Sequence, residues 1–271
     1  MKLPTLLLLA IRLASAQNNP PLDNKHWGPI VLTAIKGLME WQPRAKGFEY
    51  DLEGDEKKLA LDGSVKEQNK VKVAYKELEG HRWGMVLERN GKPTTQEQRR
   101  EQQERTAARI AAAKNESEPV REKRSKEAAK RYENNFGFLR DLPEAFDFKL
   151  VERTKIAGRD IAVLAFTPRL DYKPSQLRAR IFTKVSGTIW IDEAESQAAK
   201  MTAEVFEEFS FGGVFANLGK GTHFQFSQTR VGNTVWLPDR IDTKVFAKLL
   251  MLKSFNSETI EVITNHRKIE H

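Results

Sequence analysis

The side chains that most often do chemistry are present in this chain, but their spacing fits no common site. The five histidines are His26, His81, His223, His266 and His271. None stands in an HExxH pair or four residues from another, the spacing that would place two imidazoles on one helical face for zinc. Cysteine is absent, which excludes disulfides and thiolate metal sites. The sequence therefore predicts no metal site.

Patterns for a nucleophile, a phosphate loop and a carboxylate pair also fail. Ser210 lies in Phe209–Gly213, which lacks the first glycine of a nucleophile elbow. The run Gly219–Thr222 has glycine where a phosphate loop needs serine or threonine. Asp192 and Glu195 follow the end of an expected strand, where acidic residues are common turn formers. We therefore expect neither an enzyme nor a bound cofactor.

Apolar and aromatic side chains are the remaining chemical feature. They have two interpretations: an ordinary core between a sheet and helices, or an apolar cavity for an acyl chain, since ligand pockets are concave and mostly apolar. Both interpretations hold if a curved sheet has too few helices to cover it, because the uncovered part then leaves a cavity beside the core. The candidate cavity residues are Trp190, Phe206, Phe209, Phe211, Phe224, Phe226, Trp236 and Leu38.

Most of these residues lie on runs that alternate apolar with polar positions. Gly187–Asp192 and Val235–Arg240 are each centred on a tryptophan and stopped by turn residues, with Met201–Phe209 and Thr222–Val231 between them. Strands at this spacing predict an antiparallel meander, not parallel units with crossover helices. Further strands are expected in the ranges 48–52, 65–77, 83–88, 148–156, 159–167, 245–256 and 258–267.

A helix is expected over Pro29–Trp41, ended by Pro43. Its apolar residues recur with the 3.6-residue period and would share one side, so it is the candidate cover for the sheet. These residues are Ile30, Val31, Ala34, Ile35, Leu38 and Met39. The range 174–184 is expected to be a short helix or an extended connection.

Residues 93–135 differ in composition and are expected to form a charged helical insertion. From Pro93 to Glu133 there are eleven basic and eight acidic residues. Thr95 followed by Gln98 indicates a capping box, and the range 115–119 should break the segment into two helices. Without a bulky apolar face, these helices suit neither a core nor a membrane surface. A solvated arm is the favoured interpretation.

The chain as a whole has 271 residues and a formal net charge of +8. Its 45 basic residues are interleaved with 37 acidic ones, and no nucleic-acid-binding signature is present, so we expect no nucleic-acid partner. Residues 1–16 have the order of a signal peptide: Lys2, then the apolar Leu3–Ile11, then the small-residue site Ala14–Ala16. An uncleaved amphipathic anchor is the alternative. We therefore expect a periplasmic or secreted protein with a single domain over residues 17–271.

Four phrases carry a resemblance to a known family: Leu142–Phe148, Gly187–Asp192, Val235–Arg240 and Lys253–Phe255. Together they resemble the LolA/LolB-like superfamily of outer membrane lipoprotein-sorting proteins. The resemblance implies an α+β fold, mainly antiparallel, in which a curved incomplete β-barrel wraps around helices. It also implies a carrier that shields an acyl chain crossing the periplasm.

Two functions follow as hypotheses. The first is a periplasmic, monomeric carrier of a lipid or a lipidated protein, served by an outer or inner membrane protein partner. The second is a non-carrier interaction protein that docks a partner through the helical insertion. They differ in whether the sheet encloses an apolar cavity of roughly 300 Å³ or more.

Overall fold

The fold was obtained as a computed structural model, which describes residues 23–78, 81–210, 216–232, 235–249 and 253–269. The predicted signal peptide and Phe211 lie outside the described residues.

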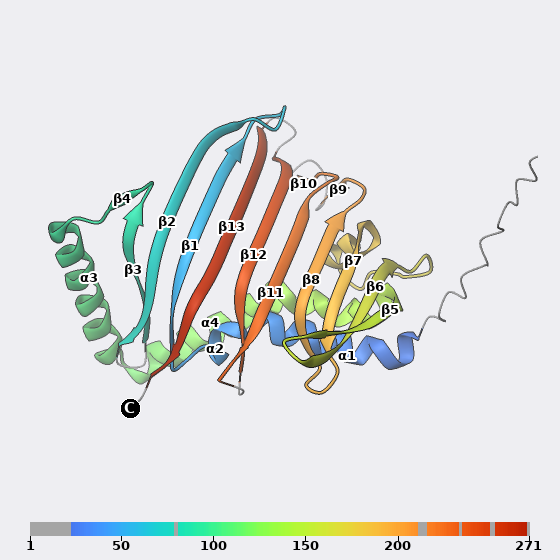
Figure 1. The fold of residues 1–271 in the computed structure, drawn as a ribbon, viewed down its shortest axis with the longest axis horizontal. Coiled ribbons are helices and arrows are strands. Elements are labelled where there is room, and N and C mark those ends of the chain that lie inside the picture. The colour runs from blue at the N-terminus through green and yellow to red at the C-terminus, as the bar shows by residue number, and fades with distance from the viewer. Residues whose placement is uncertain (1–22, 79–80, 211–215, 233–234, 250–252, 270–271) are drawn as a thin grey trace, which may run out of the picture.

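One antiparallel sheet runs through the molecule (Figure 1). Its main strands follow the order β4-β3-β2-β1-β13-β12-β11-β8-β7-β6-β5, and the short β9 and β10 extend it beside β12. The strands are β1 (Phe48–Leu59), β2 (Val65–Leu78), β3 (His81–Arg89), β4 (Lys92–Pro93), β5 (Phe146–Ile156), β6 (Arg159–Pro168), β7 (Val185–Asp192), β8 (Gln197–Val205), β9 (Phe209–Ser210), β10 (Ala216–Leu218), β11 (His223–Val231), β12 (Val235–Leu249) and β13 (Lys253–Lys268).

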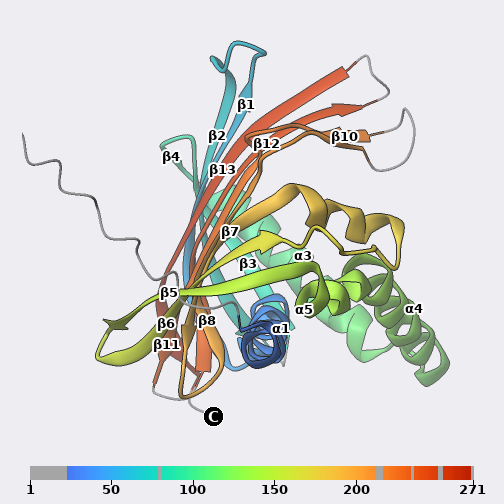
Figure 2. The ribbon, with the colours of Figure 1, turned by 90° about the vertical axis from the view of Figure 1, so that its right-hand side faces the viewer.

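The sheet curves toward its helices but stays open (Figure 2). β3 with its short partner β4 forms one edge and β5 the other, so no pairing closes a barrel among the described strands. The predicted fold class, a mainly antiparallel curved sheet around helices, is confirmed. The predicted meander is confirmed as β7, β8, β11 and β12, and the turn at Ala157–Gly158 joins β5 to β6.

The helices are α1 (Asn24–Met39), α2 (Trp41–Arg44), α3 (Gln96–Lys114), α4 (Glu118–Phe136) and α5 (Leu142–Ala145), with 3₁₀ turns η1 (Gly137–Asp141) and η2 (Leu177–Lys184). The predicted first helix exists, but it begins at Asn24 instead of Pro29. The Asp23 carboxylate accepts a hydrogen bond from the His26 amide at 3.1 Å and so caps it earlier. Pro43 does not end this helix; it lies within the short α2.

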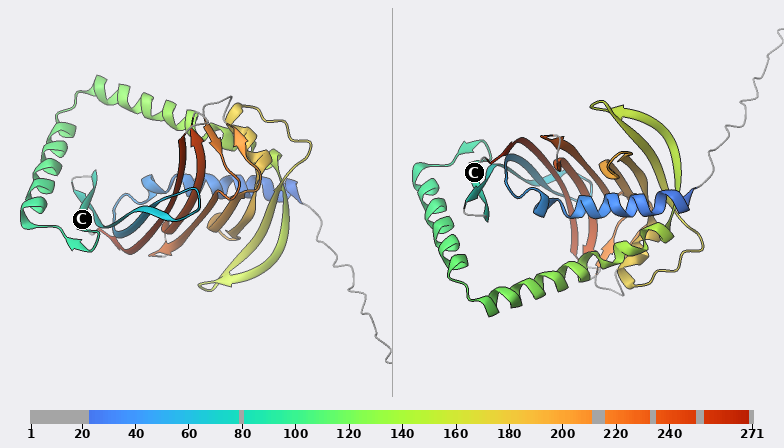
Figure 3. Two further views of the ribbon diagram at one scale, coloured as in Figure 1. Left: turned by 90° about the horizontal axis from the view of Figure 1, so that it is seen from above. Right: turned by 90° about the horizontal axis from the view of Figure 1, so that it is seen from below.

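The charged segment forms the two predicted helices, and its capping box is confirmed: Thr95 and Gln98 bond reciprocally. The sequence did not predict the path of this segment relative to the sheet. It leaves β4 at one edge of the sheet and returns to β5 at the opposite edge (Figure 3). The segment is therefore the crossover between the two edges. The proposed domain boundaries at residues 17, 93 and 135 stay predictions.

The main hydrophobic core lies between α1 and the β5–β8 and β11 part of the sheet. Ala34, Leu164 and Ile191 are completely buried there. In this layer, the apolar face of α1, whose residues recur every 3.6 positions, packs on the apolar face of the strands, whose residues recur every second position. Met39, Phe138 and Phe224 pack at its margin, only partly buried.

Candidate functional site

An apolar pocket of about 310 Å³ opens at the margin of this core. Its exposed lining surface is entirely apolar. The lining residues come from α1, η1, α5, η2 and one face of the sheet: Ile35, Met39, Phe138, Leu139, Leu142, Phe146, Phe166, Ile181, Phe182, Val185, Met201, Ala203, Glu204, Val205, Leu218, Thr222 and Phe224.

Local periodicity explains how these side chains meet. On β8, Met201, Ala203 and Val205 are two residues apart and share the face that carries the helices. Phe224 on β11 is the cross-strand partner of Ala203 and so points to the same side. On α1, Ile35 and Met39 are one turn apart. The sheet forms the floor of the pocket and the helices form its walls.

The pocket offers a ligand little polar chemistry. Its two polar lining residues are Glu204 and Thr222. Glu204 is exposed to solvent. The Thr222 hydroxyl already accepts a hydrogen bond from the Phe246 amide at 3.0 Å. The arrangement can therefore bury an aliphatic chain, whereas a charged group would find no fixed partner inside.

The solvent exposure of the lining residues distinguishes the rim of the pocket from its interior. Leu139, Leu142 and Phe146 are buried, while Met39 and Ile181 are partly exposed. Met201, Ala203, Leu218 and Phe224 are partly exposed as well, and Glu204 is exposed. The pocket therefore meets solvent both near the end of α1 and η2 and along β8, β10 and β11.

The structure places the sequence-predicted residues in several different environments. Phe224 lines the pocket, and Leu38 and Phe226 lie in the adjoining core. Phe209 is buried outside the pocket lining, and Phe206 is 40% exposed. Trp190 and Trp236 belong to a separate small cluster with Ile161 and Ala199, and neither lines the pocket.

The two tryptophans serve the opposite face of the sheet. The Trp236 indole N–H donates to the Glu195 carboxylate at 2.6 Å, and its ring lies 5.7 Å from the Arg159 guanidinium. Arg159 also pairs with Asp192, which is fully buried. Burial alone would raise the pKa of Asp192, but hydrogen bonds from Arg159 and from the Glu195 amide lower it below its usual value. This ion network fixes the β7–β8 turn.

Sequence reasoning missed the walls contributed by irregular segments. Phe138, Ile181 and Phe182 come from 3₁₀ turns, which have no long-range periodicity to read. Leu142 and Phe146 lie in a phrase quoted for the family resemblance, yet nothing in that phrase indicates a pocket. Their joint position depends on the packing of α5 against α1 and η2.

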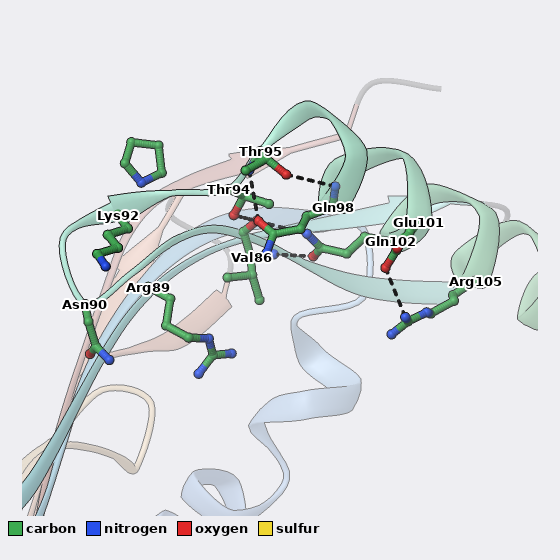
Figure 4. A pocket seen from close by; sticks show the side chains of 11 residues that line it. Val86, Arg89, Asn90, Lys92, Thr94, Thr95, Gln98, Glu101, Gln102 and Arg105 are labelled. Carbon is green, nitrogen blue, oxygen red and sulfur yellow. Dashed lines mark hydrogen bonds and ion pairs between the residues drawn. The ribbon is translucent and has the colours of Figure 1, made fainter.

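A larger cleft, about 630 Å³, lies between β3, β4 and α3 (Figure 4). It is lined by exposed charged residues, among them Arg89, Lys92 and Arg105. Inside it, the Gln102 amide oxygen accepts from the Val86 amide at 2.8 Å, and the Thr94 hydroxyl donates to the Val86 carbonyl at 2.7 Å. These bonds dock α3 on the strand edge, so we assign this cleft a structural role.

The described residues contain no group of three His, Asp or Glu side chains that could hold a metal ion. No helix among them is long and apolar enough to cross a membrane.

Comparison with known proteins gave matches of structure only. No family model matches the sequence, and no curated protein matches it. A LolA superfamily protein from Nitrosomonas europaea is 10% identical, with 88% of this chain and 94% of that chain covered and a TM-score of 0.25. A DUF1329 family protein from Desulfovibrio piger is 11% identical, with 90% and 98% covered and a TM-score of 0.25.

A putative outer membrane lipoprotein-sorting protein domain from Vibrio parahaemolyticus is 10% identical, with 87% of this chain and 92% of that chain covered, again with a TM-score of 0.25. Matches with such TM-scores carry no argument about the site, which rests on the geometry given above.

Proposed function

We propose that this protein is a carrier that binds an acyl chain of a lipid or of a lipidated protein. The observation that carries the proposal is the pocket of about 310 Å³ whose exposed lining is entirely apolar. That volume lies at the lower end of the range of ligand pockets. It favours a single chain over a bulky multi-chain lipid.

The binding energy would come from burial of methylene groups. Each buried methylene contributes about 0.8 kcal/mol, so a chain burying about 15 of them gains about 12 kcal/mol. Association costs at least about 4 kcal/mol, which leaves at most about 8 kcal/mol, or a Kd of about 1 μM or weaker. An affinity of this order suits a carrier, because the ligand is held in transit and can still be released.

The proposed location is the periplasm or the cell exterior, with cleavage after Ala16. The support is the order of charged, apolar and small residues in residues 1–16. A membrane protein that delivers or receives the ligand is part of the same proposal.

The test is titration with a fluorescent C16 fatty acid. Ala203→Trp places an indole in the pocket floor and is expected to weaken binding at least tenfold. The matched control is Leu52→Trp, on β1 outside the pocket lining, which should bind like the unmodified protein. No binding by the unmodified protein would refute the carrier function, and equal binding by both variants would refute this pocket as the site.

A further inference from the structure

The outer edge of β3 is paired with a side chain where a further strand could lie. The Gln102 side-chain oxygen of α3 accepts from the Val86 amide at 2.8 Å, and its nitrogen donates to the Val86 carbonyl at 3.3 Å (Figure 4). One side-chain amide thus makes both bonds that a residue of a neighbouring antiparallel strand would make. Gln102 therefore occupies the position of a strand at this point of the edge.

The opposite edge of the sheet, β5, is capped in a similar way. The Asn24 side-chain oxygen of α1 accepts from the Phe148 amide at 2.8 Å, while the Asp23 amide donates to the Phe148 carbonyl at 3.4 Å. Further along β5, a register shift between Leu150 and Glu152 interrupts the strand. Caps and bulges of this kind keep exposed edges from pairing with other strands. Both edges are therefore guarded, each by the amide of one side chain.

The two guards differ in how firmly their helices are held. α1 is anchored by residues buried in the main core, so the Asn24 cap is permanent. In the described part of the chain, no residue of α3 is buried, and its Arg100 and Arg105 form ion pairs with Glu104 and Glu101 of the same helix. Release of α3 from β3 would therefore leave the core intact.

The strand that α3 guards can pair with a copy of itself. The register of β3 on β2 is regular from Arg82 to Val86, so Gly84 directs its amide and carbonyl to the outer edge as Val86 does. If Gly84 lies opposite Gly84 of an antiparallel copy, Val86 extends the ladder at each end. Trp83 of one copy then faces Met85 of the other. Both side chains are partly exposed, and contacts between sulfur and aromatic rings are favourable.

We propose that the outer edge of β3 is a strand-addition site for a second copy of this chain, and that Gln102 keeps this site closed. The inference is independent of the proposed carrier function. When Gln102 withdraws, the Val86 amide becomes available and the two β3 strands join their sheets. The Thr94 hydroxyl, which donates to the Val86 carbonyl at 2.7 Å, need not move, because a carbonyl oxygen accepts two hydrogen bonds.

The β3 edge of the copy is a better partner than its β5 edge. Arg153 and Lys155 of β5 would bring two positive charges beside Arg82 of β3, whereas β3 paired with itself opposes no like charges from residue 82 to residue 86. The Asn24 cap also stays in place on β5. The expected assembly is therefore a closed dimer with twofold symmetry and not an open chain of copies.

The test measures the molar mass of Gln102→Ala by size-exclusion chromatography with light scattering, over a concentration series. The unmodified protein should be a monomer, and the variant should approach twice the monomer mass as its concentration rises. In the dilute monomeric variant, the Val86 amide should exchange its hydrogen about tenfold faster, because it has lost its partner. The matched control is Gln103→Ala, the exposed neighbour on α3, which should stay monomeric.

A second change tests the register of the pairing. Val86→Pro removes the N–H that would bond the copy, and proline is tolerated on edge strands. Gln102→Ala combined with Val86→Pro should therefore return to the monomer mass. Circular dichroism identifies any variant that has lost its fold. If Gln102→Ala does not fold, Gln102→Asn replaces it, because its shorter side chain cannot reach Val86, and the same doubling of mass is expected.

Each outcome decides the proposal. A folded Gln102→Ala or Gln102→Asn that stays monomeric would overturn the guard. A dimer that persists after Val86→Pro, or one that Gln103→Ala forms equally well, would show that the copies meet elsewhere and would overturn the β3 site. Fatty acid binding is measured separately, so neither result bears on the carrier function.

Discussion

One face of the sheet has two halves that are stabilised in different ways. In the covered half, β5–β8 and β11 pack against α1, α5 and the 3₁₀ turns around one large core. In the open half, β1, β2, β12 and β13 extend well beyond the helices as strands of 12 to 16 residues (Figures 1 and 2). Among the described residues, the short α2 packs on β12 and α3 lies along β3.

The open half has a small buried cluster, Ala45, Phe48 and Leu237, beside its hydrogen-bond ladder and cross-strand charge pairs. Lys57 of β1 meets Glu258 of β13 at 2.7 Å, and Lys58 meets Glu67 of β2 at 2.7 Å. Such solvent-exposed pairs contribute little each, about 0–1 kcal/mol. The comparison shows that strand pairing can extend a sheet past its main core, whereas the apolar pocket lies where helices partly cover the sheet.

The largest expected difference concerns burial. Leu164→Ala removes a fully buried side chain from the core of the covered half and should lower the free energy of unfolding by about 2–5 kcal/mol. Leu52→Ala makes the same change at a half-exposed site in the open half and should cost about 1 kcal/mol or less. Urea denaturation of both variants measures the two values. Equal losses would mean that the open half has a core of comparable quality.

A smaller difference concerns charge. Asp192→Asn removes the buried carboxylate that pairs with Arg159 in the covered half, at an expected cost of about 3 kcal/mol near pH 7. Glu258→Gln removes the partner of Lys57 in the open half and should cost less than about 1 kcal/mol. Thermal melts at matched pH compare the two.

The Asp192 effect should also depend on pH. Because the folded protein lowers the pKa of Asp192, its contribution is present above the unfolded value, about 3.9, and is lost as the pH falls through the folded value. The difference between the unmodified protein and Asp192→Asn should therefore shrink below about pH 4. A difference that stays constant down to pH 2 would show that Asp192 acts through packing alone.

Local sequence signals predicted the elements of both halves. The alternation along Thr222–Val231 and the capping box at Thr95 are short-range features, and both appear as expected. The strand faces near the tryptophans were harder to assign. A register shift between Trp190 and Ile191 and another between Ser227 and Gln228 interrupt the simple two-residue alternation.

The pocket and the crossover depend on contacts that no local pattern records. Phe138 and Ile181 stand 43 positions apart in the chain and meet only because η1 packs against η2. The charged segment was recognised from its composition, but that composition does not show that its ends join opposite edges of the sheet. Long-range topology, not residue type, decides both.

Native mass spectrometry of protein isolated from its own cells tests the central claim most directly. If the covered half holds an acyl chain, the protein should carry one lipid or fatty acid per molecule, and Ala203→Trp isolated in the same way should carry none. An unmodified protein whose mass matches the polypeptide without any ligand would contradict the account.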